Sequence, residues 1–84
     1  MDVQAINAAV GAEIRAARAK RGYNQRELAE RAGLGFSTIR RLESGERAAD
    51  VPQLRAICDA LRVDPGELVT RALAEVSALG ETGE

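Results

Sequence analysis

Apolar residues recur every three or four positions along almost the whole chain, and this helical period most restricts its possible folds. No stretch alternates apolar and polar residues over more than a few positions, and β-branched residues are sparse, which argues against strands. The first helical segment carries a stripe of Ile6, Val10, Ile14 and Ala17, and Gly22 marks its end. The pattern predicts an all-α fold.

Capping residues divide the next part of the chain into two short helices. Asn24 followed by Glu27 has the spacing of a capping box, and Gly33 ends the helix that it opens. A third helix runs from about residue 36 to residue 44, and Gly45 follows where a left-handed residue is favoured. The inward positions of these two helices are Leu28, Ala29, Ala32, Ile39 and Leu42.

Two further helices begin with an aspartate cap and a proline in the first turn. Asp50 precedes Pro52, and Asp64 precedes Pro65, where the missing N–H of proline does no harm. The apolar stripes of these helices are Leu54, Ile57, Cys58 and Leu61, then Leu68, Val69, Ala72, Leu73, Val76 and Leu79.

Length and composition fit one folded domain. The chain has 84 residues, 45% of them apolar and 30% charged, which is typical of a globular protein and too short for two domains. We therefore predict a compact five-helix domain over residues 1–79, whose last helix spans about 64–79, and a polar tail over 80–84.

Several classes of protein are excluded by what the sequence lacks. There is no histidine, and Cys58 is alone, so catalytic triads, histidine metal sites, disulfides and cysteine-based zinc sites are excluded. We expect no enzyme activity, no cofactor and no metal, with Cys58 a buried small hydrophobe. No apolar run is long enough to span a membrane, and no signal peptide is present, so we expect a cytoplasmic protein.

The net charge of −1 conceals two halves of opposite sign. Residues 1–48 hold nine Lys or Arg against six acids, whereas residues 49–84 hold three Arg against seven acids. A basic first half next to an acidic second half indicates a polyanionic partner for the first half only.

The two short helices are joined by "GLG", and the second has adjacent arginines, Arg40 and Arg41, among polar outer positions. Two short helices around a tight glycine-containing turn are typical of a helix-turn-helix. The DNA major groove is wide enough for one helix, so such a helix can bring its side chains to the base edges.

The sequence resembles the phage repressor/Cro-like helix-turn-helix family, also called lambda repressor-like, from about Val10 to Leu68. "AEIRAARAKRGYNQRELAERAGL" matches the first two helices of that family, "STIRRLESG" its recognition helix, and "LRAICDALRVDPGEL" its last two helices. The resemblance implies a five-helix fold and binding to double-stranded DNA.

The resemblance also implies roles for individual residues. Residues at base-reading positions, with Arg40 at the groove edge, are Phe36, Ser37, Arg40 and Arg41. Residues at positions that hold the DNA backbone are Asn24, Gln25, Arg26, Thr38, Ser44 and Arg47. Arg18 and Glu43 occupy positions that commonly form a buried ion pair between the first and third helices.

Four positions depart from the family pattern, one of them Ala49, which stands where the family usually has proline. Phe36 stands where a polar base reader is common; it would pack on thymine methyl groups instead. Gly35 replaces the usual Ser or Thr cap of the recognition helix, and Arg62 replaces a glycine that often follows the fourth helix.

These observations predict a sequence-specific DNA-binding transcriptional regulator that acts as a repressor by occupying an operator. Two alternatives stay open: the antitoxin or autorepressor of a toxin–antitoxin pair, and a helical module that binds a protein and no DNA. We expect a homodimer on DNA, with Leu73, Val76 and Leu79 at the contact, because a twofold pair doubles the readout. In the alternative, the last helix folds back on its own domain.

Overall fold

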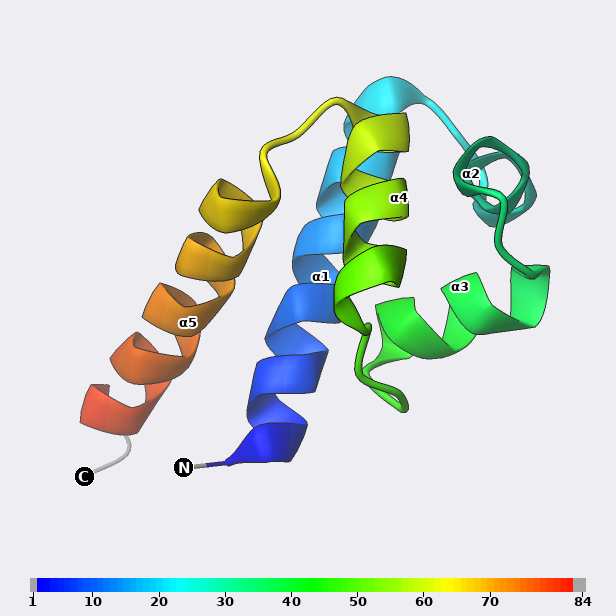
Figure 1. Ribbon diagram of the computed structural model, residues 1–84. Helices are drawn as coiled ribbons and strands as arrows, with labels where there is room; N and C mark the ends of the chain where they lie inside the picture. Colours follow the sequence, from blue (N-terminus) through cyan, green and yellow to red (C-terminus); the bar gives the residue numbers. More distant parts are fainter. Residues whose placement is uncertain (1, 83–84) are drawn as a thin grey trace.

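The computed structural model describes residues 2–82, with side chains as far as residue 78, and contains five helices in this range (Figure 1). They are α1 (Val3–Arg21), α2 (Gln25–Ala32), α3 (Phe36–Ser44), α4 (Val51–Leu61) and α5 (Pro65–Thr82). The predicted all-α, five-helix fold is confirmed. The expected end of the last helix at residue 79 is corrected, because α5 continues to Thr82 and takes in part of the predicted tail. Residues 83–84 of that tail lie outside the described residues.

The capping residues act locally, as their spacing indicates. The side chain of Asn24 accepts a hydrogen bond from the backbone N–H of Glu27 at 2.8 Å, and Glu27 accepts one from the Asn24 N–H at 2.9 Å. Asp50 and Gln53 make the same reciprocal pair at the start of α4. By contrast, Gly35 at the start of α3 offers no side chain to cap that helix.

α1 is the central element of the fold (Figure 1). α5 packs beside it and runs in the opposite direction, α4 lies next to it, and α3 crosses near its first half. α2 packs against α3 and α4 and sits at the far side from α5. The helix-turn-helix formed by α2 and α3 therefore lies at one side of the molecule, and α5 lies at the other.

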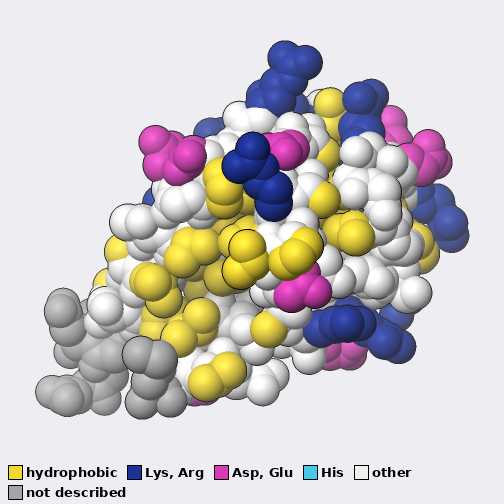
Figure 2. Space-filling view, in the orientation of Figure 1, with side chains coloured by type: hydrophobic (Ala, Val, Ile, Leu, Met, Phe, Trp, Pro, Cys, Tyr) yellow, Lys and Arg dark blue, Asp and Glu magenta, His cyan; other side chains and the backbone are white. Residues whose placement is uncertain are grey.

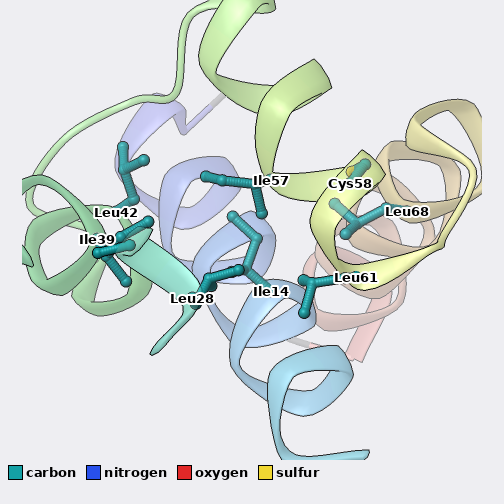
Figure 3. Packing of buried hydrophobic residues seen from close by; sticks show 9 residues of the cluster. Ile14, Leu28, Ile39, Leu42, Ile57, Cys58, Leu61 and Leu68 are labelled. Carbon is teal, nitrogen blue, oxygen red and sulfur yellow. The ribbon is translucent and has the colours of Figure 1, made fainter. Parts of the chain in front are cut away.

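Aliphatic side chains from all five helices form the core (Figure 3). Ile14 of α1 and Ile57 of α4 are fully buried at its centre, and Leu28 and Ile39 bring α2 and α3 onto them. Cys58 is also fully buried, as predicted for a small hydrophobe, and burial raises the pKa of its thiol.

A close approach of two backbones sets the position of α3 on α1. Gly11 is buried, and a Cβ atom built there would meet the carbonyl oxygens of Leu42 and Glu43, the latter at 2.6 Å. Any side chain at residue 11 would therefore push α3 away from α1. The sequence pattern alone did not single out this glycine.

Candidate nucleic-acid interface

α3 divides sharply into a buried and an exposed side. Ile39, Leu42 and Glu43 are buried, with 0%, 2% and 3% of their surface exposed. The exposed residues of this helix are Ser37, Arg40, Arg41 and Ser44. At 3.6 residues per turn these four positions fall within an arc of about 100°, so a polar, doubly basic face points away from the core.

Glu43 joins three helices through its carboxylate. Arg18 of α1 donates to it twice, from Nε to Oε2 at 2.7 Å and from a terminal nitrogen to Oε1 at 3.0 Å. Gln25 at the start of α2 donates its amide N–H to Oε1 at 3.1 Å. The hydrogen bonds that Arg18 donates to Glu43 raise the pKa of Arg18, so the guanidinium is held in its charged form. We call this group, Arg18, Gln25 and Glu43, the Glu43 clamp.

An open hollow of about 280 Å³ lies over the Glu43 clamp. Besides the clamp it is lined by Arg15, Arg40, Arg41, Ser44 and Glu46, so three exposed arginines from α1 and α3 surround it. Arg15 donates from Nη1 to the backbone carbonyl of Glu43 at 3.3 Å. Arg41 Nε lies 3.9 Å from the carboxylate of Glu46, and both side chains are more than half exposed.

Arg15 was not predicted as a site residue, although a signal for it exists. It stands three residues before Arg18, so a helix must bring both side chains to the same face. The sequence alone did not show that this face meets the end of α3.

At the opposite end of α3 the predicted residues Arg26 and Phe36 meet. The guanidinium carbon of Arg26 lies 4.2 Å from the centroid of the Phe36 ring, over its face. Arg26 is exposed and Phe36 is half-buried, so the ring is neither a core residue nor a free surface residue. This contact between α2 and α3 was not predicted.

The other residues predicted to hold the DNA backbone are distributed around the helix-turn-helix. The Asn24 oxygen is occupied by its cap, Thr38 is half-buried, and Arg47 is exposed in the loop after α3. The Ser44 hydroxyl donates a hydrogen bond to the Arg41 carbonyl at 3.1 Å, and so it provides a donor for one of the carbonyl groups at the end of α3.

The residues predicted at a dimer contact lie on α5, far from this face. Leu73 is 44% exposed, and Val76 is half-buried. The side chain of Leu79 lies outside the described part of the structure. A mostly apolar groove of about 160 Å³ lies between α1, the loop after α3 and α4, with Ile6, Val10 and Leu54 among its lining residues; Val69 is the one lining residue from α5. Figure 2 shows hydrophobic side chains gathered over α5 and as far as the start of α4.

Two further features bear on the kind of protein. Among the described residues, no helix is both long and apolar enough to cross a membrane. Within the same residues, no three Cys, Asp or Glu side chains gather in a way that could hold a metal ion.

Comparison with solved structures finds chains of the same fold. The clp gene regulator ClgR from Corynebacterium glutamicum is 26% identical and superposes with a TM-score of 0.84 over 93% of this chain and 83% of that one. A second structure of ClgR is 28% identical, with a TM-score of 0.77 over 83% of this chain and 91% of the other.

The restriction-modification controller protein C.AhdI from Aeromonas hydrophila is 29% identical, with a TM-score of 0.71 over 74% of this chain and 94% of that chain. A search of curated protein sequences gave no significant match.

The helix-turn-helix family model matches residues 14–68, which include α2, α3, α4 and the Glu43 clamp. Members of this family bind double-stranded DNA, and they are transcription regulators rather than enzymes. With its fold, its exposed basic recognition helix and this match, the chain belongs to the Cro/C1-type helix-turn-helix family and is a DNA-binding transcriptional regulator.

Proposed function

We propose that the protein is a sequence-specific repressor that inserts α3 into the major groove of an operator and blocks transcription by occupying it. Arg40 and Arg41 meet base edges or the groove margin, and Ser37 reads a neighbouring base. Contacts to phosphate from Arg47 and the start of α2 set the register on the duplex but carry no sequence information.

The observation that carries this proposal is the exposed arc of α3. Its arginines and serines face outward while the opposite side is anchored by Ile39, Leu42 and the Glu43 clamp. A helix held so firmly can present donors in fixed positions, which base recognition requires and a general electrostatic contact does not. The two similar proteins of known structure, a clp gene regulator and a restriction-modification controller protein, are both regulators, which also supports this role.

The test separates base reading from backbone contact. Sequences bound from a random duplex pool define the operator, and Arg41→Ala should then lose about 1–3 kcal/mol of specific binding and relax one base position. Arg47→Ala should weaken binding to all sequences alike and lower the salt slope by about one. Equal losses on specific and random DNA in both variants would show that the roles are not divided in this way.

The same titration tests the rival function, a protein-binding module whose DNA face is idle. Binding to DNA should weaken steeply as salt rises, because Lys and Arg displace condensed counterions. A wild-type protein with no salt-dependent binding to duplex DNA would favour the module.

We also propose that the protein binds its operator as a twofold dimer through α5. The exposure of Leu73 and the hydrophobic side chains gathered over α5 (Figure 2) support this, since contiguous exposed apolar surface is typical of interaction sites. Val3 and Val51 are 65% and 80% exposed and add apolar surface on α1 and α4. A symmetric pair would place its recognition helices about 34 Å apart on a near-palindromic operator.

Sedimentation of the complex on a selected operator measures the number of chains. Leu73→Glu should give one chain per operator instead of two. Ala74→Glu is the matched control and should keep two chains, because it adds the same charge at an exposed position about 100° around α5. A wild-type complex of one chain on a non-palindromic site would end the dimer proposal.

A further inference from the structure

Arg26 occupies a position that does not favour helix stability. It is the second residue of α2, where the positive end of the helix dipole disfavours a cation. Its guanidinium makes no hydrogen bond or ion pair with any described residue; its protein contact is the ring of Phe36. By contrast, Arg18, Arg21 and Arg71 all donate to oxygens of the protein. Hydrogen bonds and ion pairs within the described part of the fold therefore do not explain Arg26.

The stack on Phe36 restricts where the guanidinium can lie. A free arginine on a surface samples many rotamers, but one held over an aromatic face has fewer, and it keeps its five N–H donors unused. A planar guanidinium held in one orientation suits a two-point contact, either to a base edge or to a phosphate. The stack thus prepares Arg26 for a two-point contact, and its place beside Phe36, the first residue of α3, favours a base edge.

We propose that Arg26 and Phe36 form one reading unit that recognises a thymine and a guanine on neighbouring base pairs. In the major groove, guanine offers the O6 and N7 acceptors that match the arginine fork, and thymine offers a C5 methyl group that an apolar ring edge can contact. The inference rests on the proposed function, and it moves Arg26 from the backbone contacts to the base readers.

The spacing of Arg26 and Phe36 in the stack fits the distance between two successive base pairs of DNA. The guanidinium carbon and the ring centroid are 4.2 Å apart, close to the rise of about 3.4 Å between successive base pairs. Two groups separated by about this distance can each contact one of two neighbouring base pairs. Phe36 is the first residue of α3, the end of a recognition helix that meets base edges.

The test uses modified bases in a selected operator. Replacing the critical thymine with uracil removes only the methyl group, and replacing the guanine with 7-deazaguanine removes only the N7 acceptor. We expect each change to lower wild-type affinity roughly tenfold. Arg26→Lys keeps the charge but loses the planar fork and the stack, so it should bind more weakly than wild type and lose less affinity with 7-deazaguanine than wild type does.

Two further variants separate the stack from general effects. Phe36→Leu removes the aromatic face and should weaken the guanine preference, with a thermal melt to verify that it folds. Should it not fold, the uracil duplex still tests the methyl contact on the unaltered protein. Arg31→Lys is the control: Arg31 lies 4.3 Å over the Tyr23 ring, but about 140° around α2 from Arg26, and should keep the consensus.

Two results would overturn the inference, and they are distinguishable. If Arg26→Ala weakens specific and random DNA equally and lowers the salt slope by about one, Arg26 contacts phosphate, and the proposed function stands without this reading unit. If the wild-type protein selects no sequence at all, both the reading unit and sequence-specific binding are wrong.

Discussion

Replacing Glu43 with glutamine removes one charge from the Glu43 clamp and leaves the side chain almost the same size. The carboxylate side chain is 2% exposed, and that of Arg18 is 17% exposed. Glu43→Gln therefore leaves an arginine that is largely withdrawn from water without its counter-charge. The backbone of α3 and the exposed reading face are not altered by this change.

The expected cost follows from the geometry. Breaking a buried ion pair by removing one partner costs about 3–5 kcal/mol. Arg18 keeps some solvent and a hydrogen bond from Nη1 to the Tyr23 carbonyl at 2.8 Å, which reduces the penalty. We expect a loss of about 2–4 kcal/mol. An 84-residue domain has about 4–13 kcal/mol of stability in total, so the melting temperature should fall by about 8–30 °C.

Urea unfolding followed by circular dichroism measures the free energy of unfolding of each variant. The double variant Arg18→Met with Glu43→Met should recover much of the loss, because no unpaired charge remains. Arg55→Gln is the matched control. The side chains of Arg55 and its ion-pair partner Asp59 are 70% and 61% exposed, so the loss of this pair should cost less than about 1 kcal/mol.

Two results would refute this reasoning. A Glu43→Gln protein within about 0.5 kcal/mol of wild type would mean that water reaches Arg18 more easily than its burial indicates. A double variant as unstable as the single one would mean that the clamp acts by filling space or through Gln25, rather than by neutralising charge.

Three other changes have definite expected outcomes. Gly11→Ala should destabilise the fold by about 1–3 kcal/mol or more in urea unfolding, since its Cβ would collide with the end of α3; an unchanged protein would mean that α3 can shift freely. Arg62→Gly should stabilise the fold by about 0.5–1 kcal/mol, because Arg62 has a φ of 57°, which is unfavourable for a residue with a side chain. A melting temperature equal to or lower than that of wild type would contradict this. Glu46→Gln should raise affinity for duplex DNA severalfold in a fluorescence titration, because it frees Arg41 and removes a negative charge from the hollow; weaker binding would show that Glu46 positions Arg41.

The sequence by itself determined the helices, most of their ends and the helix-turn-helix. These features depend on interactions within three or four residues, such as the reciprocal bonds of Asn24 with Glu27, or on an apolar stripe that repeats along one segment. The end of α5 was the exception, because the run from Gly80 to Thr82 carries no apolar signal and yet continues the helix. The Arg18–Glu43 pair came from the family resemblance, since no spacing in the sequence joins residues 25 positions apart.

Only the tertiary structure decided how the outer residues of these helices meet. The crossing of α1 and α3, set by the close approach at Gly11, brings Arg15 to the Glu43 carbonyl. The angle between α2 and α3 turns Gln25 toward Glu43 and lays Arg26 on Phe36. Each contact joins side chains from different helices, and helical periodicity fixes directions within one helix but not the angles between two. The charges available to DNA were therefore readable in the sequence, and the atoms that hold them in place were not.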